Sequence, residues 1–139
     1  MSTYLVTGAA GFIGSKVADA LLAQGHQVVG VDNLSAAYDV RMKEHRLQNL
    51  LPQPGFTFLK TDITDLAVID QLAEVVPRAQ AVINLAAMAG VRQSMSDPWS
   101  YLYTNTLGTL NLLEYTRRQE VLKFILASTS SLYGADGTQ

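Results

Sequence analysis

The stretch Gly8-Ala-Ala-Gly-Phe-Ile-Gly14 decides the fold of this chain. It follows a short apolar run at residues 4–7 and opens a segment in which Ile13, Val17 and Leu21 recur every fourth residue. This pattern predicts a strand, a tight glycine turn and an amphipathic helix that ends at Gly25. Backbone N–H groups and the positive dipole at the start of such a helix can hold a pyrophosphate. Three glycines also occur in other turns of α/β proteins, so the rest of the chain must show whether this turn binds a nucleotide.

Each glycine has a physical reason in a nucleotide-binding turn. Gly8 permits the tight turn, Gly11 lets the backbone approach the phosphates, and Gly14 lets the helix pack closely. Asp32 ends the second predicted strand, 18 residues past Gly14, where a carboxylate can accept both hydroxyls of an adenosine ribose. An aspartate there repels a 2′-phosphate and no adjacent arginine binds one, so we expect NAD rather than NADP. The alternative for Asp32 is a helix cap or a solvated turn.

Short apolar runs alternate with helix-period segments along the whole chain. Strands are predicted at residues 4–7, 27–31, 56–59, 81–85 and 122–127, and helices at about 13–24, 40–50, 67–75 and 98–118. The last helix begins at Asp97-Pro98, a cap followed by a proline, and Leu102, Leu110 and Leu113 are expected to face inward. Repeated right-handed strand-helix-strand units predict five buried parallel strands in a doubly wound sheet with helices on both faces.

Polar or small residues follow three further strands, at the sheet edge where open α/β proteins bind ligands. Asp62 and Ile63 follow the third strand, where they could hydrogen-bond and cover an adenine; a cap is the alternative for Asp62. Tight packing could equally explain Leu85-Ala86-Ala87 after the fourth strand, and a surface position could explain Asn105. Residues 127–134 run Ala-Ser-Thr-Ser-Ser-Leu-Tyr-Gly, and four successive hydroxyls there favour a substrate contact over a capping cluster.

Composition excludes several classes of function. The 139 residues have a formal charge of −2 with acidic and basic groups interspersed, so no nucleic-acid partner is expected. Cysteine is absent and the two histidines lack metal-ligand spacing, so neither a disulfide nor a metal site is expected. There is no 18-residue apolar run and no basic leader, which predicts no membrane association and a cytoplasmic location.

These motifs, in this order, resemble the extended short-chain dehydrogenase/reductase superfamily and, within it, the NAD-dependent epimerase/dehydratase family. The resemblance covers essentially the whole chain and implies a Rossmann-type fold. It is strongest to the UDP-glucuronate 4-epimerases, through residues 31–35 (Val-Asp-Asn-Leu-Ser), 38–43 (Tyr-Asp-Val-Arg-Met-Lys), 89–94 (Ala-Gly-Val-Arg-Gln-Ser) and Asp97-Pro98. Asn84 departs from the pattern, because related sequences often have histidine there.

The resemblance assigns roles to particular residues. It implies that the pyrophosphate of NAD is held by Gly8, Gly11, Phe12 and Ile13, and the adenosine ribose with its adjacent phosphate by Asp32, Asn33 and Ser35. It implies that the adenine is held by Asp62 and Ile63. The nicotinamide side of NAD would be lined by Leu85, Ala86, Ala87 and Asn105. It also implies that Thr129 directs its hydroxyl at the sugar C4 oxygen.

The family's catalytic Tyr-x-x-x-Lys pair is missing from residues 1–139. None of the six tyrosines has a lysine four residues later, so the general base is absent. We therefore interpret residues 1–139 as one NAD-binding Rossmann domain, truncated before the substrate lobe and inactive alone.

The parent enzyme implied by the resemblance is an isomerase that acts on a nucleotide sugar. It would oxidise C4 of UDP-glucuronate transiently with NAD and return the hydride to the opposite face. Its substrate would be a UDP-hexuronate or a UDP-hexose, and it is expected to be a homodimer joined partly through residues 98–118. The alternatives are a UDP-glucose 4-epimerase, a dehydratase or a decarboxylase, or a stand-alone NAD-binding module without catalysis.

Overall fold

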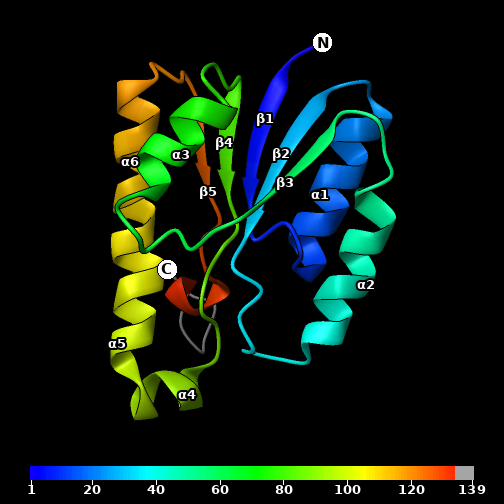
Figure 1. Cartoon of the computed structure of the whole chain (residues 1–139). Coiled ribbons are helices and arrows are strands. Elements are labelled where there is room, and N and C mark those ends of the chain that lie inside the picture. The colour runs from blue at the N-terminus through cyan, green and yellow to red at the C-terminus, as the bar shows by residue number, and fades with distance from the viewer. Residues whose placement is uncertain (134–139) are drawn as a thin grey trace.

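The computed structural model describes residues 1–133 (Figure 1). Gly134, the last residue of the hydroxyl-rich stretch, lies outside the described part, as do residues 135–139. The strands are β1 (Thr3–Thr7), β2 (Gln27–Asp32), β3 (Phe56–Lys60), β4 (Ala81–Asn84) and β5 (Phe124–Leu126). The helices are α1 (Phe12–Ala23), α2 (Val40–Leu50), α3 (Val68–Val75), α4 (Val91–Ser96), α5 (Pro98–Tyr101), the π-helix η1 (Leu102–Gly108), α6 (Thr109–Arg118) and the 3₁₀-helix η2 (Ser130–Tyr133).

The strands form one parallel sheet in the order β3-β2-β1-β4-β5. Helices α1 and α2 cover one face of this sheet, and α3 and α6 cover the other (Figure 1). The prediction of a doubly wound Rossmann-type sheet with helices on both faces is therefore confirmed. The strand order reverses between β1 and β4, and folds of this kind bind ligands at the carboxyl ends of the strands beside such a point.

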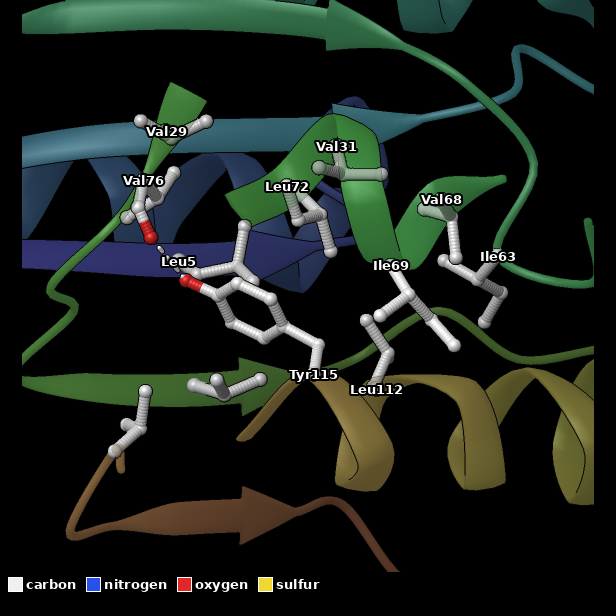
Figure 2. Close-up of a cluster of buried hydrophobic side chains, with 12 residues drawn as sticks. Leu5, Val29, Val31, Ile63, Val68, Ile69, Leu72, Val76, Leu112 and Tyr115 are labelled. Atoms are coloured by element: carbon white, nitrogen blue, oxygen red, sulfur yellow. Dashed lines mark hydrogen bonds between the residues drawn. The ribbon is translucent and has the colours of Figure 1, made fainter. Parts of the chain in front are cut away.

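The core is divided by the two-residue period of the strands. Leu5 and Val29 belong to a buried cluster that includes residues of α3 and α6 (Figure 2). Their strand neighbours Val6 and Val28 belong to a second cluster with residues of α1 and α2. Each face of the sheet therefore buries its own apolar layer, and the site lies at the carboxyl edge between these layers.

Two expectations about the core are wrong. The predicted helix at 98–118 is a succession of α5, η1 and α6, and the wider turns of η1 change which positions face inward. Leu102, Leu110 and Leu113 are 53%, 59% and 43% exposed, whereas the residues buried in η1 and α6 are Gly108, Asn111, Leu112 and Tyr115.

The second correction concerns the expectation of five buried strands. Strand β5 forms one edge of the sheet and pairs only with β4 among the described strands. Ile125 and Leu126 are 51% and 55% exposed. An edge strand has a neighbouring strand on one side only. An apolar sequence does not distinguish such a strand from a central one, so the exposure of β5 could not be predicted from its residues.

Candidate nucleotide-binding site

The glycine turn between β1 and α1 is packed so closely that side chains are excluded. Gly8 has a φ of +66°, and a Cβ there would lie 2.9 Å from the Ala86 backbone nitrogen. A Cβ on Gly14 would overlap the Gly8 carbonyl oxygen. Gly14 thus allows close packing against the backbone of the turn itself.

The start of α1 leaves its amide groups available to a ligand. Gly11 occupies the cap position without a capping side chain, and the first turn carries no acidic residue. The first backbone N–H groups of a helix lack partners within the helix, and its dipole is positive there. Phe12 and Ile13 belong to this turn, with side chains 69% and 63% exposed. A diphosphate fits this end of α1 in both charge and hydrogen bonding.

Asp32 lies at the carboxyl end of β2, and its carboxylate is buried beside the turn. Its Oδ2 accepts a hydrogen bond from the Ala10 backbone N–H at 3.2 Å. Its Oδ1 accepts one from the Leu34 backbone N–H at 2.8 Å and one from Lys43 Nζ at 3.2 Å. The carboxylate therefore connects the glycine turn, the β2 terminus and α2.

Lys43 is a residue of the candidate site that we did not single out from the sequence. It lies on α2 in phase with Leu47 and Leu50, and all three are buried. Its Nζ also donates to Ser35 Oγ at 3.4 Å and lies 5.3 Å from the centroid of the Tyr38 ring. A lysine at a core position of an amphipathic helix was the available signal, because a buried cation requires a partner.

Asn33 and Asp62 join the ends of β2 and β3. Asn33 Nδ2 donates to Asp62 Oδ2 at 2.8 Å. Partial burial of Asp62 disfavours its charged form, but hydrogen bonds from Asn33 and from the Thr64 backbone and hydroxyl outweigh this effect, and the pKa of Asp62 lies below its ordinary value. Asp62 therefore presents an ionised acceptor at this edge.

The segment after β4 is held by a polar network. The Thr7 hydroxyl donates to Asn84 Oδ1 at 2.6 Å and accepts from the Leu85 and Ala86 backbone N–H groups, each at 3.2 Å. Asn84 Nδ2 donates to Thr109 Oγ1 at 3.1 Å. Asn84 is buried, and its neutral amide links β1 to α6 through both of its polar atoms.

Asn105 fixes the next part of the same segment. Its Oδ1 accepts from the Met88 backbone N–H at 2.8 Å, and its Nδ2 donates to the Met88 carbonyl at 3.0 Å. This two-point contact ties η1 to the loop after β4. Asn105 thus acts on the backbone of the loop and does not itself line the cleft described next.

A cleft at the carboxyl edge of the sheet gathers most of the predicted cofactor-binding residues. Its lining contains Gly8, Gly11, Asp32, Asn33, Ser35, Asp62, Ile63, Leu85, Ala86 and Ala87. It also contains residues that were not assigned there from the sequence: Val31, Tyr38, Lys43, Thr61, Met88 and Thr104. Phe12, Ile13, Asn105 and Thr129 lie outside this lining.

Thr129 follows β5 at the same carboxyl edge, between the strand and η2. Its carbonyl accepts a hydrogen bond from the Leu132 backbone N–H at 3.4 Å. Among residues 1–133, no group of three histidine, aspartate or glutamate side chains is arranged to hold a metal ion. Within the same residues, no helix has the length and apolar character needed to cross a membrane.

Comparison with known proteins gives the family. Residues 4–139 match the model of the NAD dependent epimerase/dehydratase family. The chain is 50% identical over 133 residues to the UDP-glucuronate 4-epimerase of Thermodesulfobacterium geofontis, covering 96% of this chain and 41% of that protein. It is 45% identical over 131 residues to UDP-glucuronate 4-epimerase 2 of Arabidopsis thaliana, covering 94% and 30% of the two chains.

Solved structures agree with these relatives. UDP-glucuronic acid 4-epimerase from Bacillus cereus, in complex with UDP-glucuronic acid and NAD, superposes with a TM-score of 0.84 at 37% identity, covering 95% of this chain and 41% of that one. The UDP-Glc/GlcNAc 4-epimerase from Campylobacter jejuni gives a TM-score of 0.86 at 32% identity, covering 99% and 40%. The chain spans about two fifths or less of the length of these proteins. It belongs to the NAD-dependent epimerase/dehydratase family.

Proposed function

We propose that this chain is the NAD-binding part of a UDP-glucuronate 4-epimerase. The observation that carries the proposal is the cleft itself, in which an uncapped helix start, a buried Asp32 and small residues after β4 lie along one edge of the sheet. A diphosphate, a ribose and a flat ring could occupy these three places in turn. The 50% identity to a protein named UDP-glucuronate 4-epimerase supports the choice of substrate.

Each group of residues has a defined part in this proposal. The backbone N–H groups of Phe12 and Ile13 would hold the pyrophosphate, because α1 provides no other partner for its first turn. Gly8 and Gly11 would leave room for the phosphates, since the Gly11 N–H itself donates to the Gly8 carbonyl at 2.9 Å. Asp32, with Asn33 and Ser35 beside it, would hold the adenosine ribose.

The two rings of the cofactor would lie at opposite ends of the cleft, beyond β3 and beyond β4. Asp62 and Ile63 would contact the adenine, while Leu85, Ala86 and Ala87 would leave room for the nicotinamide end. When bound, NAD would accept a hydride from the sugar C4 and return it to the opposite face.

The substrate contact that this chain would supply is Thr129. Its hydroxyl would hydrogen-bond the sugar C4 oxygen and so fix the orientation of the reacting carbon. None of the six tyrosines has the lysine four residues later that the family's proton carrier needs. We therefore propose that residues 1–139 alone catalyse no turnover, and that the whole protein is a cytoplasmic, homodimeric isomerase.

The test is an assay of the protein encoded by the complete gene. That protein should convert UDP-glucuronate to UDP-galacturonate in the presence of NAD, as followed by chromatography. The 139-residue chain should give no product above a blank without protein. Turnover of UDP-glucose in place of UDP-glucuronate would contradict the assigned sugar. A reading frame that stops after Gln139 and a chain that binds NAD without turnover would instead favour a stand-alone module.

A further inference from the structure

The ion pair between Asp32 and Lys43 is buried at the wall of the cleft. Lys43 Nζ lies 3.2 Å from Asp32 Oδ1, and the two side chains are 8% and 5% exposed. A buried ion pair commonly gives little net stability, because removing both charges from water is costly. Its position beside the proposed ribose site points to a role in recognition.

The hydrogen bonds already made by Asp32 limit what it can offer a ribose. A carboxylate has about four acceptor positions, two on each oxygen. The Leu34 backbone N–H and Lys43 Nζ occupy Oδ1, and the Ala10 backbone N–H occupies one position on Oδ2. One acceptor position remains, whereas an adenosine ribose presents two hydroxyl groups.

Lys43 can supply the missing partner. Its ammonium has three donors, of which Asp32 Oδ1 and Ser35 Oγ accept two. Lys43 lines the cleft together with both of those residues. A third donor therefore remains for an oxygen on the ribose or on a phosphate attached to it.

We infer that the ion pair of Asp32 with Lys43 determines which nicotinamide dinucleotide the cleft accepts. This inference rests on the proposed NAD-binding function. Lys43 holds one ribose hydroxyl while Asp32 holds the other, and its charge cancels that of Asp32. The pair as a whole is neutral, so the cleft repels a 2′-phosphate less than an unpaired aspartate would. A cation is therefore present near the ribose, but Asp32 neutralises it and so keeps Lys43 from binding a 2′-phosphate.

The inference predicts the effect of removing the charge of Asp32 alone. Asp32→Asn preserves the shape of the side chain but leaves Lys43 as an uncompensated cation beside the ribose. A 2′-phosphate carries a charge of about −1.5 to −2 and accepts strong hydrogen bonds from such a cation. The ratio of NADP affinity to NAD affinity should rise by about tenfold or more, the value of one charge-assisted hydrogen bond.

The test compares this ratio among variants of the 139-residue chain by calorimetric titration with NAD and with NADP. Either single change leaves one buried charge of the pair without its partner, so circular dichroism must show that Asp32→Asn remains folded. The informative comparison is then with the double change Asp32→Asn with Lys43→Met. It removes both charges, and the gain in NADP preference should disappear.

Arg46 provides the matched control, because it is a second cation of α2 near the turn. Its Nη1 donates to the Ala10 carbonyl at 3.3 Å and to the Tyr38 hydroxyl at 3.0 Å. Asp32→Asn with Arg46→Met should retain the gain in NADP preference. Equal ratios for Asp32→Asn and its Lys43→Met double variant would overturn the inference, as would loss of the gain only with Arg46→Met. An unmodified chain that binds neither nucleotide would instead overturn the proposed function, and this inference with it.

Discussion

Tyr115 is a polar residue at the centre of the larger core cluster. Its ring lies among Leu5, Leu72 and Leu112, and its hydroxyl donates to the Val76 carbonyl at 2.5 Å (Figure 2). This bond joins α6 to the end of α3. Burial raises the pKa of Tyr115 to about 12, because a phenolate would be poorly solvated there.

Replacing Tyr115 with phenylalanine should lower the free energy of unfolding by about 1–3 kcal/mol at neutral pH. The change leaves the buried Val76 carbonyl without its donor, which carries a desolvation penalty of this size. Urea denaturation followed by circular dichroism measures the difference. An unchanged midpoint would mean that the carbonyl finds another partner.

Alkaline pH should destabilise the unmodified chain through the same residue. A raised pKa in the folded state contributes stability that is complete below the unfolded pKa near 10 and is lost as the pH rises toward 12. The loss should reach roughly 1.4 kcal/mol per pH unit in this window. Urea denaturation at pH 8 to 11.5 should therefore bring the stabilities of the unmodified chain and Tyr115→Phe together. Parallel pH profiles would show that Tyr115 ionises normally.

Among the structural elements, η1 and α6 show where sequence reasoning reached its limit. A regular period of 3.6 residues placed Leu102, Leu110 and Leu113 inward, but the π-helix breaks that period. By contrast, α2 was predicted with its correct bounds, because Asp39 stands directly before its first residue and Pro52 lies two residues after its last. Periodicity locates a helix well, whereas it locates the buried face only if the helical geometry is uniform.

Gly108, the last residue of η1, gives a test of how this element acts on the cleft. A Cβ there would lie 2.6 Å from the Ile63 side chain, and Ile63 lines the cleft. Gly108→Ala should raise helix propensity by about 0.5–1 kcal/mol yet weaken NAD binding, because Ile63 must move. Thr106→Ala, at an exposed position of η1, is the control and should leave NAD affinity unchanged. Equal NAD affinities for both variants in calorimetric titrations would show that Ile63 moves away without affecting the cleft.

At the scale of the whole molecule, the sequence was sufficient for the sheet and for most of the cleft. The glycine turn and Asp32 are recognisable because each stands at the end of a predicted strand, at a fixed spacing along the chain. Lys43 was missed because its role depends on α2 folding back across the end of β2. Asn84, noted in the sequence as a departure, proved to be a buried link whose partners, Thr7 and Thr109, are distant in sequence.

The exposed apolar surface predicts self-association of this chain. Leu102, Tyr103, Leu110 and Leu113 on η1 and α6 are all more than 40% exposed. Burial recovers about 25 cal/mol per Å², so a patch of a few hundred Å² could drive association. Sedimentation velocity over a concentration series should show a shift to larger species. Leu110→Glu should reduce that shift, whereas Leu66→Glu, at an exposed position before α3, should not. A monomer at every concentration would contradict the prediction.

The central claim is that NAD binds across the glycine turn and Asp32, and calorimetric titration of the 139-residue chain with NAD tests it most directly. The unmodified chain should bind NAD at one site, and Gly11→Val should bind none, because the new side chain occupies the path of the pyrophosphate. Circular dichroism must show that the variant remains folded, and Gly25→Asn, at the opposite end of α1, should bind as the unmodified chain does. The account predicts binding that is lost only with Gly11→Val. Equal NAD affinities for the unmodified chain and Gly11→Val would contradict it.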